Sequence, residues 1–314
     1  MPPVAKHHFA GSHVALVIDG DRASTAYLKS AEGGMFKSAP TEEPNAAYHI
    51  RGKHSSVREM DALSFEFGMS GAKWALGLVS KIVKDPTVAH IPFDGEVHHA
   101  DSNFKSQYCY EFIGARITEF TLPKLDAKSK EHATLKLKCQ PESIEFGITE
   151  GAKLPPGSVA KQKQWLCSAF RFTINNGIGE VQASSIESLS VKIGAKAFQV
   201  GHFRNPQYTS TGKLEMPKLS FVVPMQFSKE LVGWFKNAIG REHGLEDADG
   251  GYEKDATIEF MDPTRKNCLY MIHLGGVGPE TLSVVKGTND AATMMKFDCY
   301  VTSIELEETG KGVI

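Results

Sequence analysis

Glu59-Met-Asp-Ala-Leu-Ser-Phe-Glu-Phe-Gly-Met69 returns later in the chain as Glu215-Met-Pro-Lys-Leu-Ser-Phe-Val-Val-Pro-Met225. Six of the eleven residues are identical, at an offset of 215 − 59 = 156. A second pair of stretches, 139–146 and 299–306, shares the pattern Cys-x-x-x-Ser-Ile-Glu followed by an apolar residue, at an offset of 299 − 139 = 160. A period of half the chain is too long for a solenoid. The sequence therefore predicts two copies of one domain.

Alternating apolar residues predict strands in both halves. Leu63, Phe65 and Phe67 recur at every second position, which is typical of a half-buried strand. By this criterion we expect strands at 14–18, 63–67, 108–112, 115–120 and 134–139, and again at 169–174, 219–223, 256–261, 269–274, 281–285 and 294–301.

Each half also predicts one amphipathic helix. In the first half, Ser70 is the expected N-cap, and the apolar stripe 74–82 runs at three- and four-residue steps toward Lys84. In the second half, Ser228 is the expected N-cap and Gly240 the expected stop. The fold class is therefore mainly β, with two tandem antiparallel β-barrel or sandwich domains and one packed helix on each.

The two predicted domains are joined by a linker with a distinct composition. Residues 151–164 contain Pro155-Pro-Gly157 and then a polar Lys-Gln-Lys-Gln run, without apolar periodicity. We expect the first domain at 1–150 and the second at 165–314. Two further segments, 31–56 and 196–213, are expected to form long loops or extended hairpin arms.

Composition and charge exclude several classes of protein. Apolar residues make up 41% and charged residues 23% of the 314 residues, which is typical of globular proteins. The net charge of −2 is divided evenly between the halves, so the sequence has no basic domain and no nucleic-acid-binding motif. No apolar run reaches the roughly 20 residues of a membrane span, and 1–8 lacks a signal-peptide core. We expect synthesis in the cytoplasm.

The five cysteines predict buried thiols. Cys139 and Cys299 occupy equivalent positions in the two halves, and Cys109 and Cys268 nearly do. All four lie in strand-like runs, and none has the close Cys-x-x-Cys spacing of a zinc or redox site. We therefore expect small apolar core residues and no structural disulfides.

The best candidate for a metal site is a histidine-rich segment. His90, His98 and His99 alternate with Asp94 and Asp101 in what the sequence predicts to be a loop. The spacing is not that of a known zinc site, and the second half has no counterpart. Metal binding is the less favoured interpretation.

Other motifs also have a structural interpretation. Asp19-Gly-Asp21 is expected to be a turn, and the acidic segment 242–251 a solvated loop that lacks calcium-loop spacing. Gly275-Gly-Val-Gly278 lies between two predicted strands and so favours a bulge or close strand contact over phosphate binding. Trp74 and Trp234 are expected in the core. The sequence predicts no catalytic, cofactor-binding or metal-binding residues and no cofactor.

Residues 117–137 carry a resemblance to a known family. The segment Ile117-Thr-Glu-Phe-Thr-Leu-Pro-Lys-Leu-Asp-Ala127, which leads into the strand 134–139, resembles the tail tube proteins of contractile-tailed phages and extracellular contractile injection systems. In that family a Pro-x-Leu-Asp/Asn-Ala loop joins two strands before the C-terminal strand. The likeness extends more generally over 8–146. In the second half, Asn289-Asp-Ala-Ala292 stands in the same place without the proline.

The resemblance implies a structural role without enzymatic activity. Tube proteins of this family form hexameric rings of β-barrels stacked around a lumen, and their ordinary subunits have one domain. A chain with two such domains implies a trimer that forms a pseudo-hexameric ring, either in the inner tube or at the tube-to-baseplate or spike junction. The implied partners are further copies, tube, sheath, hub and baseplate proteins, with possible luminal cargo. The arms 31–56 and 196–213 are expected to reach neighbouring rings.

Two other functions remain open at this point. A β-barrel module that binds a ligand or carbohydrate would place exposed aromatic side chains together in one cleft, whereas most aromatic residues here lie at periodic core positions. A hydrolase or metal enzyme would use the histidines of 90–101, and would need a bound metal ion.

Overall fold

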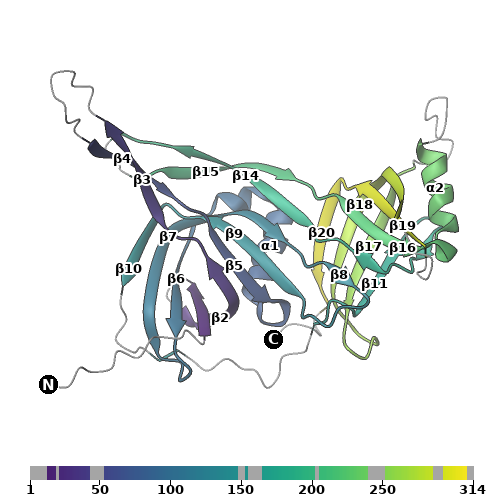
Figure 1. Ribbon diagram of the computed structural model, residues 1–314, viewed down its shortest axis with the longest axis horizontal. Helices are drawn as coiled ribbons and strands as arrows, with labels where there is room; N and C mark the ends of the chain where they lie inside the picture. The colour runs from purple at the N-terminus through teal and green to yellow at the C-terminus, as the bar shows by residue number, and fades with distance from the viewer. Residues whose placement is uncertain are drawn as a thin grey trace.

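The structure is a computed structural model, and it consists mainly of β-strands (Figure 1). It describes residues 13–18, 21–42, 53–147, 153–154, 165–201, 205–239, 252–285 and 293–309, without the side chains of 21–25, 56 and 57. The predicted turn at Asp19-Gly20, the acidic segment 242–251, Gly240, and the stretch 289–292 lie outside these residues. So does most of the predicted linker, and the domain boundaries stay a prediction.

The first half forms a closed antiparallel barrel. Its strands pair in the order β7-β6-β1-β2-β5-β9, and β9 pairs again with β7 to close the circle. β10 pairs with residues 109–113 of β7, on the edge opposite β6. The elements are β1 (His13–Ile18), β2 (Asp21–Glu32), β3 (Phe36–Glu42), β4 (Lys53–Met60), β5 (Leu63–Gly68), η1 (Met69–Gly71), α1 (Lys73–Lys84), η2 (Pro86–His90), β6 (Phe93–Ala100), β7 (Ser106–Thr121), β8 (Leu125–Asp126), β9 (Thr134–Gln140) and β10 (Ser143–Gly147).

The second half repeats this order of elements. Its strands pair as β12-β11-β17-β18-β19-β16-β13, and β20 pairs with β18 as β10 does with β7. The elements are β11 (Phe170–Ile174), β12 (Gly179–Glu180), β13 (Ser185–Ile186), β14 (Ser190–Phe198), β15 (Gln207–Glu215), β16 (Leu219–Pro224), η4 (Met225–Phe227), α2 (Lys229–Ile239), β17 (Lys254–Met261), β18 (Cys268–Val285), β19 (Met294–Tyr300) and β20 (Ser303–Glu308).

Strand pairing identifies equivalent residues in the two halves. Cys139 of β9 pairs with Ile117 of β7, and Cys299 of β19 pairs with Pro279 of β18. In both strand pairs the register shifts directly after this position. The sequence echo therefore marks a shared pattern of backbone hydrogen bonds as well as shared residues.

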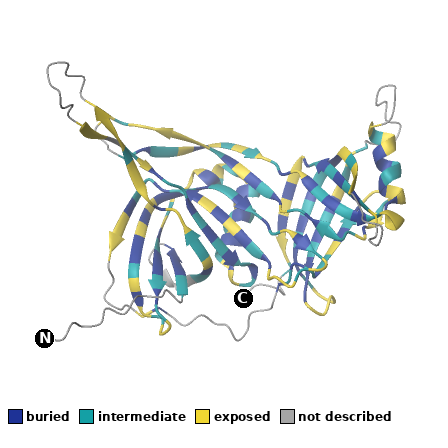
Figure 2. Ribbon diagram, in the orientation of Figure 1, coloured by how far each residue is buried: buried dark blue, intermediate teal, exposed yellow. Residues whose placement is uncertain are grey.

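The alternating apolar residues fill the barrels. Leu63, Phe65 and Phe67 of β5 are buried, and Leu219 and Phe221 occupy the same places in β16. Most of the buried apolar residues of both halves belong to one continuous cluster, so the two barrels share a core. Figure 2 shows the alternation as dark and light bands along the strands. The mainly β prediction with one helix per half is confirmed.

Two predictions about the strands are wrong. The stretches 108–112 and 115–120 form one bent strand, β7, and the stretches 269–274 and 281–285 form one strand, β18. The segment 93–100, expected to be a loop, is strand β6. Its histidines concealed the alternation because one of them, His98, is buried with its ring nitrogens hydrogen-bonded.

The helices lie where they were predicted, but they begin differently. Ser70 lies in the short turn η1, and Ala72 precedes α1 without a side-chain cap. Ser228 does precede α2, yet its hydroxyl donates to the carbonyl of Met225 at 2.8 Å. The buried stripe of α1 centres on Leu76 and Val79, and Trp74 is half-buried against Phe93. Neither helix in the described part of the chain is long and apolar enough to span a membrane.

Glycine permits a bend at equivalent points of β7 and β18. Gly114 and Gly276 have φ angles of 67° and 60°. A Cβ at Gly114 would lie 2.9 Å from Glu142 Oε2, and one at Gly276 would lie 2.6 Å from Thr302 Oγ1. Before the bend each strand pairs with β10 or β20, and after it with β9 or β19. Each bend thus separates the part of the strand that pairs with β10 or β20 from the part that pairs with β9 or β19.

We predict that Gly276→Ala lowers the free energy of unfolding by about 1–2 kcal/mol, because a Cβ is disfavoured at positive φ and contacts Thr302. Thermal and urea unfolding would measure this change. Gly77→Ala is the matched control, because Gly77 lies in α1 with open space around it. Alanine there should raise stability by about 0.5–1 kcal/mol. Equal effects of the two substitutions would contradict the role of the bend.

Candidate assembly surfaces

A hairpin of the second half extends the sheet of the first barrel. β14 and β15 run over the first barrel in Figure 1, and β14 pairs with the end of β7. The partners are Ser190 with Thr121, Val191 with Phe120, and Lys192 with Glu119. Val191 is fully buried there. The junction between the two halves is therefore a continuous antiparallel sheet with an apolar contact beneath it.

Hydrogen bonds between polar side chains also connect β14 and β7. The Ser190 hydroxyl donates to Glu119 Oε1 at 2.6 Å and lies 3.0 Å from Thr121 Oγ1. The backbone N–H of Leu122 donates to the carbonyl of Leu189 at 2.8 Å. Because these groups are partly buried, their hydrogen bonds stabilise the junction by about 1 kcal/mol each.

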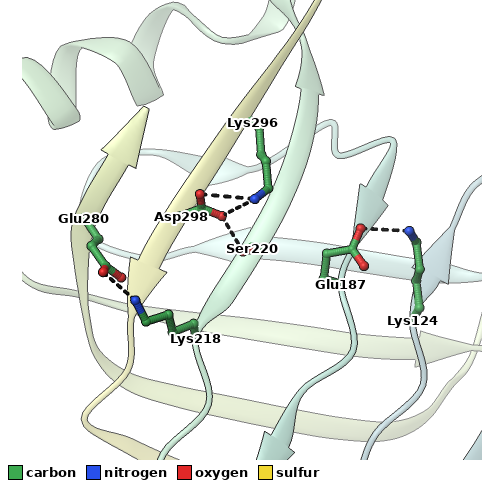
Figure 3. Close-up of polar contacts among 7 residues, drawn as sticks. All are labelled: Lys124, Glu187, Lys218, Ser220, Glu280, Lys296 and Asp298. Carbon is green, nitrogen blue, oxygen red and sulfur yellow. Dashed lines mark hydrogen bonds and ion pairs between the residues drawn. The ribbon is translucent and has the colours of Figure 1, made fainter. Parts of the chain in front are cut away.

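The loop Pro123-Lys-Leu-Asp-Ala127 also lies at this junction. Leu125 and Asp126 form β8, which pairs with β13 of the second half. Lys124 Nζ lies 2.7 Å from Glu187 Oε1, and Figure 3 shows this ion pair. The N–H of Ala127 donates to the carbonyl of Ser184 at 2.9 Å. The loop singled out in the sequence therefore holds the two halves together.

The helix of the first half covers a strand of the second. α1 packs against β20, and the Ser80 hydroxyl donates to the carbonyl of Leu306 at 3.1 Å. Leu306 is only 3% exposed. Each half thus contributes an element that covers the other: the second half contributes a hairpin and the first half contributes a helix.

The outer face of the barrel sheets is polar and carries several ion pairs. Lys29 Nζ lies 2.8 Å from Glu66 Oε1, and Lys218 Nζ lies 2.5 Å from Glu280 Oε1 (Figure 3). Three hollows on this face are lined by described residues, the largest about 600 Å³, and Tyr208 is the one Phe, Tyr or Trp side chain in their linings. This lining does not have the clustered aromatic residues expected of a carbohydrate site.

Asp298 shows why carboxylates on this face are ionised. Partial burial raises the pKa of this carboxyl, but hydrogen bonds from Ser220 and Lys296 outweigh burial, so its pKa lies below the ordinary value. Lys296 Nζ lies 2.9 Å from Asp298 Oδ1. The same balance applies to Glu66, whose pKa is lowered by Lys29 and Thr134 despite burial. These carboxylates stay ionised near neutral pH.

The candidate metal residues do not converge. Asp94 Oδ1 accepts the N–H of Gly114 at 2.7 Å, and Asp101 Oδ1 accepts backbone N–H groups of its own turn. His90 ends η2, whereas His99 lies in β6, where burial lowers its pKa. Asp94 and Asp101 are therefore occupied in shaping loops and the bend of β7.

Glu96, His98 and Cys109 form a different group of possible metal ligands. The Nε2 of His98 lies 2.8 Å from Glu96 Oε2 and 3.9 Å from Cys109 Sγ, and its Nδ1 lies 2.9 Å from Ser106 Oγ. Burial raises the pKa of the Cys109 thiol to about 12, which disfavours the thiolate that metals bind. Both ring nitrogens of His98 have hydrogen-bonding partners. The trio fits a satisfied buried histidine better than a metal site.

The remaining candidates have structural roles. All five cysteines are free, four are buried, and Cys268 is half-buried. Burial raises the pKa of Cys299 to about 12. A Cβ at Gly278 would clash with the ring of Tyr300, which confirms the expected close strand contact. Trp234 is buried and donates to the carbonyl of Tyr252.

Sequence reasoning missed the residues of the junction. Glu119, Ser80 and Ser190 are ordinary polar residues in the sequence, and no spacing rule connects them. The alternation of Leu189, Val191 and Ile193 was the available signal for β14, because every second residue in this stretch is apolar.

No protein-family model matches the sequence, and no curated protein matches it. Among solved structures, similar chains occur in the sheath–tube complex of the PVC extracellular contractile injection system in its extended state (13% identity, TM-score 0.37) and the tube-terminating cap of the anti-feeding prophage (14%, 0.40). A third is Hcp1 from Flavobacterium johnsoniae (12%, 0.29). They cover 45%, 49% and 44% of this chain and 88%, 97% and 96% of the other chains. The likeness concerns the fold of a half-chain.

We predict that the thiols react slowly in the folded protein. Ellman's reagent at pH 8 should modify Cys268 first, because it is the half-buried cysteine, and all five after unfolding. The Cys268→Ser variant is the control, because only the four buried cysteines remain in it and their rate of modification can be measured directly. Rapid modification of Cys109 in that variant, with protection by added zinc, would instead indicate a metal-binding thiolate.

We predict a pH-dependent contribution from Asp298. Because its folded pKa lies below the unfolded one, its ionised form stabilises the fold above the unfolded pKa. That contribution is lost as the pH falls through the folded pKa, below about pH 4. Asp298→Asn should therefore destabilise the protein by about 1 kcal/mol at pH 7 and by less at pH 3. A pH-independent difference in unfolding free energy would contradict this prediction.

Proposed function

We propose that this chain is a non-catalytic structural subunit of a contractile phage tail or contractile injection system. Three copies would form a ring of six barrels, in the inner tube or at the tube-to-baseplate or spike junction. The observation that carries the proposal is the continuous sheet between two barrels of equal strand order within one chain.

The kind of junction between the two halves is compatible with a ring. The first barrel contributes α1 and the edge of β7, whereas the second contributes β20 and the hairpin β14–β15. Such a contact is heterologous, because the two partners use different surfaces. Repeated between copies, a heterologous contact builds a ring if its rotation closes and a filament if it does not. The resemblance to tube proteins supports six barrels, and therefore three chains.

The two barrels are similar but not interchangeable. Arg116 Nη1 lies 2.5 Å from Glu142 Oε1 in the first, where the second has Gly278 and Thr302. The long strand β2 corresponds to the separate short strands β12 and β13. A ring of alternating barrels has three-fold symmetry with six similar positions. It therefore suits a position between a six-fold tube and a three-fold component.

The polar outer face suits the lining of a lumen. Several of its lysines are paired with carboxylates at short distances, and lysines and carboxylates occur together in the linings of its hollows, so the face presents little net charge to a passing molecule. The proposed partners are further copies of this chain and tube, sheath, hub or baseplate proteins. The ligand-binding alternative is less well supported, because the hollows on this face lack clustered aromatic residues.

We predict a complex of 3 × 34.3 = 102.9 kDa. Native mass spectrometry would measure the mass, and averages from electron microscopy should show a three-fold ring with six lobes. The measurement should be made alone and with tube, sheath and baseplate proteins from the same gene neighbourhood. A monomer under all of these conditions would overturn the proposal.

A further inference from the structure

The hairpin β3–β4 is the counterpart of the hairpin that joins the two halves. Lys37 pairs with Glu59 in β3–β4, and Lys192 pairs with Glu215 in β14–β15. In both hairpins the register shifts after the next residue, Ser38 in one and Ile193 in the other. Phe36 is therefore equivalent to Val191. β14 has β7 on its free side, but β3 pairs with β4 alone among the described strands.

The edge that β14 occupies on β7 has an open counterpart on β18. The register of β18 with β19 makes Thr281, Leu282 and Ser283 equivalent to 119–121 of β7. On one side these residues pair with β19, and no described strand pairs with their other side. The two residues that follow, Val284 and Val285, are exposed, Val284 at 60%. An exposed apolar strand edge is a template for pairing with another chain.

Exposure separates the occupied surfaces from their open counterparts. Val191 is fully buried in the junction, whereas its equivalent Phe36 is 46% exposed. Leu306 of β20 is 3% exposed beneath α1, whereas its equivalent Phe146 of β10 is 39% exposed. The difference arises because a neighbouring barrel covers only one member of each pair.

Within the described residues, the second helix has no strand of another barrel against it, whereas the first one does. α1 covers β20, and the preceding Met69 is fully buried. The equivalent Met225 before α2 is 56% exposed, and Phe227 and Ile239 are exposed as well. The counterpart of the α1–β20 contact is therefore a contact between α2 and the β10 of another barrel.

Eight of the eleven large apolar side chains that are exposed in the described residues fall on these open counterparts. They form two groups, which we call the hairpin patch and the helix patch. The hairpin patch is Met35, Phe36 and Phe146; the helix patch is Met225, Phe227, Ile239, Val284 and Val285. Phe36 and Phe146 are in contact, with ring centroids 5.9 Å apart. Figure 1 shows β3–β4 and α2 at opposite ends of the long axis.

We propose that neighbouring copies join by repeating the internal junction, so that the hairpin patch of one copy covers the helix patch of the next. β3 would pair with the open edge of β18, with Met35 opposite Ser283 and Phe36 opposite Leu282, and α2 would cover β10. This proposal rests on the proposed ring and names the contact that closes it. The occupant of each patch is a second copy of this chain. The hairpin patch is equivalent to the side of the internal junction that the second half supplies, and the helix patch is equivalent to the side that the first half supplies.

Disulfide cross-linking tests the register. Residues directly opposite in antiparallel strands have Cα atoms about 4.5–5.5 Å apart, within the range that a disulfide spans. Met35→Cys with Ser283→Cys should give cross-linked oligomers under mild oxidation, seen on a non-reducing gel. Ser190→Cys with Thr121→Cys is the internal control, because it should cross-link within one chain. Met35→Cys with Val285→Cys, two residues out of register, should cross-link much less.

Two charge substitutions test the direction of the contact. Phe36→Asp disrupts only the hairpin patch and Val284→Asp only the helix patch, and each should weaken assembly at least about tenfold by placing a carboxylate in an apolar contact. Both side chains are exposed, so circular dichroism and melting temperature should change little. A mixture of the two variants keeps one intact junction and should give a 1:1 heterodimer that does not grow. Ile91→Asp, at an exposed site outside both patches, should assemble like the wild type.

The outcomes separate this inference from the proposed function. An oligomeric wild type whose Phe36→Asp variant still assembles and whose Met35–Ser283 pair does not cross-link would overturn the inference and leave the ring in place. Cross-linked open filaments would support the contact and overturn the three-copy ring. A wild type that stays monomeric with all partners would overturn both.

Discussion

The edge of β7 beyond Gly114 is the part of the molecule on which the rest depends. One side of this stretch is paired with β9, and backbone N–H and C=O groups on the other side need partners. β14 supplies them, although it belongs to the second half. Once that pairing exists, β8 lies against β13 and α1 against β20. The two barrels then share one core, and separating them would expose both strand edges and apolar side chains.

Strands with an apolar face were predictable from the sequence. Phe65 and Phe221 alternate with polar neighbours, so period and burial agree. The strand 93–100 was not, because His98 occupies a buried position that usually holds an apolar residue. Ser70 was misleading for a related reason. The chain enters α1 through a short turn, so the residue with the best capping chemistry lies before the helix.

The junction between the halves was harder to predict than the barrels. Ser190 and Thr121 are 190 − 121 = 69 residues apart, and nothing local indicates that they meet. The loop 123–127 resembles a known family in sequence, yet its pairing with β13 depends on the tertiary arrangement. The sequence repeat nevertheless carried the needed information. Once the register of one junction is known, the offset assigns equivalent residues to every other surface.

The placement of β14 also has a consequence for biosynthesis. Ribosomes make about 5–20 residues per second, so β7 is complete roughly 3–14 s before Ser190 is added. During that interval the first barrel has an edge without its partner, and a neighbouring nascent chain could occupy it. The tether between the halves counters this exchange, because it keeps β14 at a high effective concentration. A longer or stiffer connection would shift the balance toward swapped, misassembled chains.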